Sequence, residues 1–311
     1  MAHNSLTFLG TGTSQGVPMI GCNCEVCKSP DNKDKRLRTS ALVEYEGYRI
    51  LIDCGPDFRY QMLRENITDL DAVLLTHQHK DHTGGLDDIR AFNYFRQQKF
   101  GTENPEQVAF PIYAETCVQE GLKKEFHYAF EEFKYPGVPD YKLITITDRK
   151  FCITKNNPNS SIEITPIRVM HYKLPILGFR FGNLAYITDG SSIPESEYEK
   201  LEGLEVLVIN TVRHTKHISH FSLPEALEII RRVGAPRNYL THLSHQIGTH
   251  AQLTEILEKE FPSETTTQLS ETTTQLCEVT TQLSEVTTQH HEATTNRQQV
   301  FAAYDGLKVE F

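Results

Sequence analysis

The sequence predicts an α/β fold, of the α+β kind, in which two mixed β-sheets are flanked by helices. Short β-branched or apolar runs are separated by Gly, Pro, Asn and Asp, which is the pattern of strands and turns. A few longer segments have the period of amphipathic helices. Paired strands with a short turn occur in both halves of the chain, which favours mixed or mostly antiparallel sheets over a regular βαβ winding.

The expected strands and helices follow directly from these patterns. Two of the strand segments contain a turn, near Gly47 and near Gly182. The strands are expected at Leu6–Leu9, Ala41–Asp53, Ala72–Thr76, Ile162–Val169, Gly178–Asp189, Leu204–Asn210 and Asn238–His242. One helix begins at Ser222 with Glu225 three residues later, as in a capping box. The helices are expected at Asp87–Gln97, Glu115–Phe130, Ser222–Val233 and Thr249–Phe261.

The chain divides into a folded domain, residues 1–263, and a low-complexity insertion, residues 264–298. The insertion repeats with a period of seven, from ETTTQLS to the degenerate EATTNRQ. Each repeat offers one regular apolar position among threonines, which form helices poorly, so we expect a mobile or partly helical insertion rather than a coiled coil. Residues 299–311 regain a hairpin-like alternation with a turn at Asp305–Gly306, and are expected to supply the last strands of the domain.

Composition excludes several classes of protein. The chain has 311 residues, of which 38% are hydrophobic, enough for one large core or two modest ones. It carries 41 acidic and 31 basic side chains, a formal charge of -10, so nucleic acid is not expected as a partner. No apolar run approaches the roughly 20 residues that cross a bilayer, and the first residues do not resemble a secretory signal, so a cytoplasmic protein without a membrane partner is expected.

The strongest chemical signal is a run of three histidines and an aspartate directly after an apolar strand. His77 and His79, two residues apart, can face one metal ion. Asp81 and His82 can face a second ion close to the first, as two-metal hydrolases require. The glycines at positions 84 and 85 allow the backbone to bend tightly after this loop.

Two ions need further ligands, and the sequence downstream supplies candidates. His171, Asp189 and His242 each follow a predicted strand. Ligands at the ends of several strands converge on one edge of a sheet, where a rigid scaffold holds them. Each of these residues is weak evidence alone, because a single histidine after a strand is more often a surface or core residue. The prediction depends on the whole set.

A second metal site is expected at Cys22, Cys24 and Cys27. An odd total of seven cysteines argues against a secreted disulfide framework, and the tight spacing of these three suits one metal ion. Three thiolates are one ligand short of a tetrahedral structural zinc site. His245 is the expected fourth ligand, because His242, three residues earlier, serves the other centre. The alternative is a reduced loop without metal.

The ordered set HxHxDH, then His, Asp and His, resembles the metallo-β-lactamase superfamily of binuclear hydrolases, over roughly residues 5–250. The sequence Asp53-Cys54-Gly55 resembles the Asp-x-Gly of that family, whose aspartate braces the metal loop. The resemblance implies an αβ/βα sandwich and two divalent ions, zinc or manganese, bridged by Asp189 and a hydroxide. It assigns the first ion to His77, His79 and His171, and the second to Asp81, His82 and His242.

The cysteine cluster and the opening segment FLGTGTSQGVP narrow the resemblance. Together they are similar to the branch related to phosphoribosyl 1,2-cyclic phosphate phosphodiesterase, which carries a structural zinc held by three cysteines and a histidine. This resemblance implies hydrolysis of a small phosphodiester, cyclic or open, by the hydroxide between the metals. Asp81 would orient the hydroxide, and His220 matches the family's histidine that assists the leaving group. His214 and His217 are alternatives for that role.

Other functions remain open at the level of sequence. The transfer-RNA 3′-processing branch shares the metal motif, although the acidic composition counts against it. Another hydrolase of the same fold, acting on a thioester or a lactam, is a further alternative. The heptads would also fit a repeat-bearing scaffold. A homodimer is an open alternative to a monomer. Residues 86–160 are expected to form part of the pocket wall, including Arg90, Arg96, Tyr113 and the segment Tyr135–Tyr141.

Overall fold

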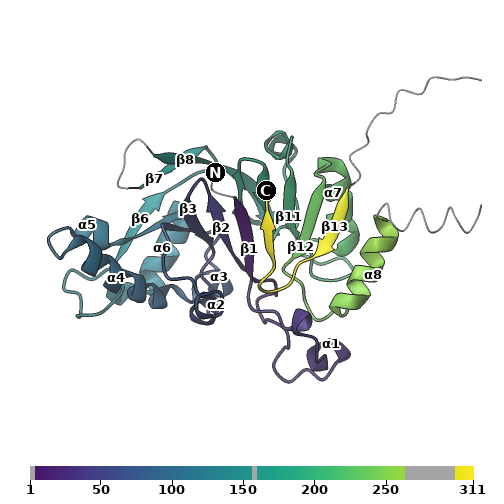
Figure 1. The fold of residues 1–311 in the computed structure, drawn as a ribbon, viewed down its shortest axis with the longest axis horizontal. Coiled ribbons are helices and arrows are strands. Elements are labelled where there is room, and N and C mark those ends of the chain that lie inside the picture. Colours follow the sequence, from purple (N-terminus) through teal and green to yellow (C-terminus); the bar gives the residue numbers. More distant parts are fainter. Residues whose placement is uncertain (1–3, 156–159, 263–297) are drawn as a thin grey trace, which may run out of the picture.

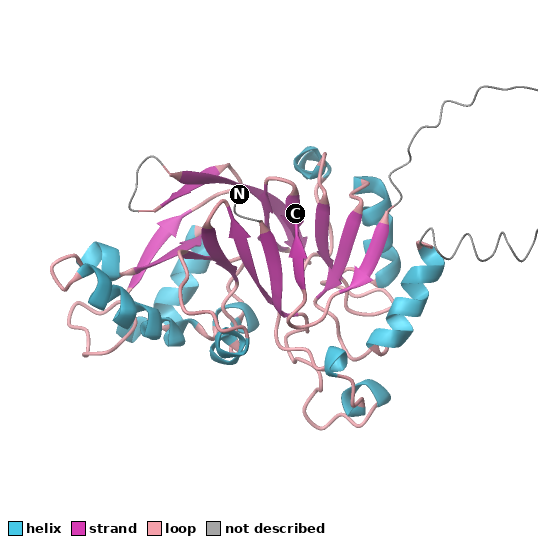
Figure 2. Ribbon diagram, in the orientation of Figure 1, coloured by secondary structure: helices cyan, strands magenta, loops and turns pink. Residues whose placement is uncertain are grey.

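A computed structural model describes residues 4–155, 160–262 and 298–311 of the chain. Two seven-stranded sheets face each other, and the long helices cover their outer sides (Figures 1 and 2). Each sheet contains both parallel and antiparallel pairs, which confirms the predicted class of two mixed sheets flanked by helices. All but the last residue of the heptad insertion lies outside the described residues, so its conformation stays a prediction.

The first sheet contains most of the amino-terminal half of the chain. Its outer face packs against α2 (Phe58–Arg64), α4 (Arg90–Phe100) and α6 (Thr116–Glu125), which bury apolar side chains on it. The short helices α1 (Glu25–Lys28), α3 (Lys80–Thr83) and α5 (Pro105–Val108) lie in its connections. The strand order is β14 (Lys308–Glu310), β1 (Ser5–Gly10), β2 (Ser40–Tyr45), β3 (Tyr48–Ile52), β4 (Ala72–Leu74), β5 (Phe110–Ala114) and β6 (Tyr141–Thr145).

The second sheet comes mainly from the carboxyl-terminal half, and its outer face packs against α7 (Leu223–Val233) and α8 (His250–Glu260). The predicted capping box at Ser222 and Glu225 is present at the start of α7. The strand order is β13 (Gln299–Ala302), β12 (Arg237–Thr241), β11 (Val206–Asn210), β10 (Leu184–Tyr186), β9 (Leu174–Phe181), β8 (Ser161–His171) and β7 (Phe151–Thr154). Four 3-10 turns complete the list: η1 (Asn32–Asp34), η2 (Leu86–Ile89), η3 (His127–Ala129) and η4 (Glu195–Leu201).

The sequence patterns do not predict β5, β6, β7 or α2. Strand β5 contains Pro111, which weakens any strand prediction, and α2 is only seven residues long. Strands β6 and β7 end their sheets, and most of their side chains are partly or fully exposed. Edge strands of this kind lack the regular alternation of buried and exposed residues on which a strand prediction depends.

The expected carboxyl-terminal hairpin is wrong. Strand β13 pairs with β12 in a parallel arrangement, whereas β14 pairs with β1 in an antiparallel arrangement in the other sheet. The turn at Asp305–Gly306 therefore carries the chain from one sheet to the other. The alternation of side chains indicates that a segment is a strand, but its partner depends on which sheet edges are open nearby.

The buried Asp305 carboxylate ties this turn to two loops of the amino-terminal half. Its Oδ1 accepts hydrogen bonds from the backbone N–H and the hydroxyl of Thr11, at 2.9 and 2.7 Å. Its Oδ2 accepts one from the backbone N–H of Leu37, at 2.8 Å. Burial raises the pKa of Asp305 above its usual value. The last residues of the chain thus hold loops that are distant in the sequence.

Replacing Asp305 by alanine is expected to lower the free energy of unfolding by about 3 kcal/mol, because donors on Thr11 and Leu37 lose their acceptor in a buried place. Urea denaturation followed by circular dichroism measures the change. The exposed Asp148, replaced by alanine, is the control and should change the free energy by less than about 0.5 kcal/mol. Equal midpoints for the two variants would contradict this role.

No helix within the described parts of the chain is long and apolar enough to cross a membrane.

Candidate metal centre

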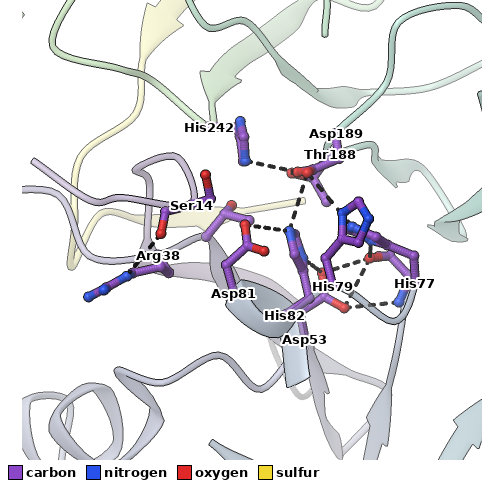
Figure 3. Close-up of polar contacts among 12 residues, drawn as sticks. Ser14, Arg38, Asp53, His77, His79, Asp81, His82, Thr188, Asp189 and His242 are labelled. Carbon is purple, nitrogen blue, oxygen red and sulfur yellow. Dashed lines mark hydrogen bonds and ion pairs between the residues drawn. The ribbon is translucent and has the colours of Figure 1, made fainter. Parts of the chain in front are cut away.

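The predicted ligands meet where the two sheets bring their strand ends together. His77 and His79 follow β4 of the first sheet. His171 ends β8, Asp189 follows β10 and His242 follows β12, all in the second sheet. Figure 3 shows the side chains of His77, His79, Asp189 and His242 pointing toward one common space. Residues that are up to 165 positions apart therefore form one cluster.

The first half of the cluster is formed by His77, His79 and His171, whose ligand atoms all lie within 4.8 Å of one another. The hydroxyl of Thr76 donates to Asp53, so it can only accept from Nδ1 of His77, 2.9 Å away. Nδ1 of His171 faces the carbonyl oxygens of Asp189 and Ser219, at 2.9 and 2.8 Å, and must donate to them. In both rings Nδ1 therefore carries the hydrogen, and the lone pair of Nε2 faces the cluster.

The second half of the cluster contains Asp81, His82, Asp189 and His242, again with ligand atoms within 4.8 Å of one another. Nε2 of His82 lies 3.3 Å from a carboxylate oxygen of Asp81 and 3.3 Å from one of Asp189. Nε2 of His242 lies 3.0 Å from the other oxygen of Asp189. Because Asp189 also lies 3.9 Å from Nε2 of His77, its carboxylate stands between the two halves.

The charges in this cluster favour bound cations. Burial alone would raise the pKa of Asp189, but His242 and His82 outweigh it and hold that pKa well below its usual range. Burial would lower the pKa of His82, but Asp189 and Asp53 outweigh it and raise that pKa. The cluster thus draws positive charge to its centre.

Unused donor atoms point to the same conclusion. Nε2 of His77, of His82 and of His242 is buried and makes no well-aligned hydrogen bond among the described residues, although carboxylate oxygens lie 3.9, 3.3 and 3.0 Å away. Leaving such atoms unpaired is costly, whereas neutral imidazoles and carboxylates are the ligands that zinc and related divalent ions take. The residues present therefore fit two divalent cations, one in each half of the cluster.

Strained backbone turns several of these side chains inward. Asp53, Asp189 and His242 have φ angles of 59°, 56° and 56°, in the left-handed region that residues other than glycine seldom adopt. The loop also packs closely on its neighbours: a Cβ at Gly85 would lie 2.0 Å from the carbonyl oxygen of Gly55. No residue larger than glycine fits at position 85 without moving the metal loop, residues 77–82, which carries four of the ligands.

Asp53 supports the metal loop from behind. Its carboxylate is buried, lies 2.6 Å from Nδ1 of His82 and accepts the backbone N–H of Thr76 at 2.9 Å. The contact with Nδ1 of His82 directs Nε2 of that ring toward the cluster. The family resemblance implied this supporting role for Asp53.

Replacing Asp53 by asparagine is expected to weaken metal binding by about 10- to 100-fold, because the amide cannot accept from both His82 and Thr76 as the carboxylate does. Competition with a chromogenic chelator measures the affinity. The surface variant Asp148→Asn is the matched control, and an affinity equal to that of the control would show that Asp53 does not orient the ligand.

Of the three histidines proposed to assist the leaving group, His220 lies closest to the centre. Its ring centroid is 4.8 Å from those of His171 and His242. The ring of His217 lies 5.0 Å from that of His220, and Nε2 of His214 lies 2.9 Å from the carbonyl oxygen of Ile247. Burial, and next the neighbouring His242, lowers the pKa of His220 to about 3, so its imidazole is neutral near pH 7 and can donate one N–H.

The predicted cysteine cluster also comes together. The three sulfur atoms of Cys22, Cys24 and Cys27 and a ring nitrogen of His245 lie within 4.8 Å of one another. Nδ1 of His245 is 3.3 Å from the sulfur of Cys22 and 3.4 Å from that of Cys24. The backbone N–H of Cys27, and next His245, lowers the pKa of Cys24 to about 6, which favours the thiolate that binds zinc. These four ligands fit one tetrahedral zinc ion.

A hollow of about 420 Å³ opens beside the histidine cluster. Tyr172 follows the ligand His171, Ser191 lies two residues after Asp189, and Lys216, His217 and Ile218 precede His220. Tyr172 and Ile218 are 51% and 69% exposed, so the hollow offers apolar surface and a lysine. No sequence pattern identifies Tyr172 or Ile218 as site residues. They could be found only because they are close in sequence to the candidate residues His171 and His220. Arg96 and Tyr113, expected in the pocket wall, line a separate cavity.

Comparisons with known proteins agree with this geometry. Residues 48–243 match the family model described as the β-lactamase superfamily domain. The crystal structure of a new diphosphatase from the PhnP family has a TM-score of 0.76 and 33% identity, covering 99% of this chain and 98% of that one.

Curated proteins match as well. The octanoyltransferase of Porphyromonas gingivalis is 42% identical over 253 residues, which are 80% of this chain and 48% of that protein. The ribonuclease Z of Methanopyrus kandleri is 28% identical over 285 residues, 81% of this chain and 91% of that protein. The chain thus spans about half the length of the octanoyltransferase.

Proposed function

This chain belongs to the metallo-β-lactamase superfamily. We propose that it is a hydrolase that cleaves a small phosphodiester, cyclic or open, with two divalent metal ions. One observation carries the proposal: two groups of metal-ligating atoms, joined by the Asp189 carboxylate, lie beside a hollow that offers Lys216. Two cations held side by side are the arrangement that phosphoryl-transfer hydrolases use.

Each metal has a complete set of protein ligands in this proposal. His77, His79 and His171 would hold the first ion, and Asp81, His82 and His242 would hold the second. Asp189 would contribute to both, because its oxygens face both groups. The ions, zinc or manganese, would acidify water and stabilise negative charge on the phosphoryl oxygens. A third ion, a structural zinc, would be held by Cys22, Cys24, Cys27 and His245.

The protein's own groups position the reactants. Burial disfavours ionisation of Asp81, but His82 outweighs it and lowers the pKa of Asp81, so the carboxylate can accept a hydrogen bond from the attacking water and orient it. The neutral imidazole of His220 donates a hydrogen bond from its N–H to the departing oxygen. The water oxygen bonds to phosphorus and gives up a proton, the bond to the leaving oxygen breaks, and that oxygen takes up one proton in turn. An open diester therefore gives a phosphomonoester and an alcohol, whereas a cyclic diester opens to a single phosphomonoester that carries the freed hydroxyl.

The leaving group is proposed to occupy the hollow beside the cluster. Tyr172 and Ile218 would contact its apolar part, and Lys216 would contact its oxygens. The proposed partner is therefore a small molecule, with neither a membrane nor a nucleic acid involved. We also propose a cytoplasmic location, because thiolates stay reduced there and available to zinc.

A diphosphate bond is the second candidate substrate. The PhnP-family neighbour, at 33% identity over nearly the whole chain, is a diphosphatase, and attack of water on phosphorus is common to both reactions. Transfer-RNA processing, suggested by the ribonuclease Z relatives, is weakened by the net charge of -10. The octanoyltransferase is about twice as long as the matched region, so its activity is not transferred to this chain.

The test is hydrolysis of bis(p-nitrophenyl) phosphate by purified protein, beside p-nitrophenyl phosphate, a dinucleoside diphosphate and a precursor transfer RNA. Turnover of the diester is expected to exceed that of the monoester, to stop after treatment with EDTA and to return with zinc or manganese. Faster turnover of the diphosphate would support the second candidate. Absence of turnover on every substrate by metal-loaded protein would overturn both.

A further inference from the structure

A second cavity, of about 1210 Å³, extends from the amino ends of β4, β5 and β6 along α2 and α4. Asp69 and Asp71, which precede β4, Pro111 near the start of β5 and Lys142 near the start of β6 all line it. These strands are parallel, and the metal loop leaves β4 at its opposite end. None of the metal-centre residues lines this cavity, so it is distinct from the site described above.

The wall of this distal cavity is largely apolar. Phe58 and Met62 of α2 and Phe92 of α4 form one side, and the rings of Phe58 and Phe92 lie 6.1 Å apart. The cavity extends inward to Ile144 and Ile153, which belong to or pack against the core between the sheets.

Apolar side chains also surround the opening of the distal cavity. Leu63 and Phe95, 60% and 59% exposed, line it, and Tyr60 and Tyr94 are exposed beside them on the same helices. Large apolar side chains gathered at the surface mark a binding site.

Some charged side chains that line the distal cavity have no ion-pair partner among the described residues. Of the five cations in the lining, Lys142 lies 3.8 Å from Glu106 and Lys155 lies 3.0 Å from Asp71. Arg59, Arg96 and Lys99 have no ion-pair partner among the described residues. Two lining carboxylates, those of Asp69 and Asp88, are likewise not in ion pairs within the described parts. The three free cations thus exceed the two free carboxylates by one positive charge.

Arg96 is the one partly buried cation among these five, and the charged groups that act on it are Asp69 and Asp71, neither of which forms an ion pair with it. Its guanidinium carbon lies 5.3 Å from the ring centroid of Phe110 and 5.7 Å from that of Phe100, which hold it in place. Its Nε donates to the carbonyl oxygen of Gln107 at 2.9 Å, and its terminal N–H groups have no hydrogen-bond partner among the residues described. A guanidinium with free terminal N–H groups binds a carboxylate in a fork.

We propose that the distal cavity binds an amphipathic monoanion, an unbranched acyl chain that ends in a carboxylate. The chain would lie along the apolar wall toward Ile153, and the carboxylate would meet Arg96 near the opening. A single excess positive charge favours a carboxylate over a doubly charged phosphate. The volume of about 1210 Å³ leaves room for such a chain.

The test is calorimetric titration of the full-length chain with decanoate and with decan-1-ol, which share the alkyl chain but differ in charge. The unmodified protein is expected to bind decanoate more tightly, by about tenfold or more. Arg96→Gln should remove that preference and leave the affinity for decan-1-ol unchanged. Ala91→Trp, which adds bulk on an exposed lining residue of α4, should weaken both ligands.

Matched controls separate these effects from misfolding. Gln98→Trp adds the same bulk on α4 outside the lining, and Lys123→Gln removes a charge on α6, so neither should change either affinity. Turnover of bis(p-nitrophenyl) phosphate should be equal in all four variants, which keeps this test independent of the proposed reaction.

The proposal would be overturned if decanoate did not bind, or if the acid and the alcohol bound with equal affinity. It would also be overturned if neither ligand bound and sedimentation showed a dimer that the substitution Phe95→Ser dissociates. The last result would show that a second copy covers the opening.

Discussion

Replacement of His79 by alanine is expected to lower kcat/KM for bis(p-nitrophenyl) phosphate by at least about 10³-fold, because the first metal loses one of its three histidine ligands. His79 is the best ligand to remove, since its side chain is exposed and the change creates no buried cavity, unlike removal of the buried His77. Steady-state kinetics with equal total metal in each assay measure the effect.

The control for His79 is His127→Ala, which removes an exposed imidazole away from the cluster. Circular dichroism should show the same fold and the same unfolding midpoint for both variants. Elemental analysis is expected to show loss of one active-site ion in the His79 variant alone. A His79 variant that keeps its metal and its turnover would remove the basis for the proposed hydrolase.

Replacement of Cys24 by serine is expected to remove one zinc ion per chain while leaving the other two ions in place, three being the number that the unmodified protein should contain. The free energy of unfolding should fall by more than the about 1 kcal/mol of an average substitution, because the metal cross-links the loop at residues 22–27 to His245. Diester turnover per folded molecule should persist.

The pH dependence of this zinc provides a second measurement on the same site. The pKa of Cys24 is lowered to about 6, so its thiolate is present above that pH and becomes protonated below it. Below that pH protons compete with zinc for the thiolate, so the zinc affinity should fall more steeply as the pH falls through 6. The exposed Cys117, replaced by serine, is the control and should keep three ions. Equal metal content in the two variants at pH 7 would contradict a zinc site at Cys24.

Much of the metal centre could be predicted without the structure. The run from His77 to His82 places four candidate ligands, three histidines and an aspartate, within six positions, and such density after a strand has few explanations other than metal binding. His171, Asp189 and His242 could be added because each follows a strand. The structure brings all seven side chains into one cluster. Local signals suffice here because the ligands lie at strand ends, which periodicity locates well.

The contacts that position the ligands and the loops could not be predicted from local sequence patterns. The carboxylate of Asp305 binds Thr11, 294 residues away, and no periodicity or motif relates the two. The choice of ring nitrogen in His77 and His171 depends on which oxygens lie beside Nδ1 once the sheets have packed. These contacts are long-range, so they arise only from the packing of complete sheets.

The tertiary structure also decided where the last strands pair and where the cavities lie. An alternating pattern at residues 299–311 is equally consistent with a hairpin and with two strands in different sheets, and the open edges at β12 and β1 select the second. Arg96, on α4, and Tyr113, on β5, line the distal cavity rather than the hollow beside the metal centre, which no local pattern in the sequence indicates. Ligand identity is a local property of the chain, whereas the space around a ligand is created by surfaces that meet only after folding.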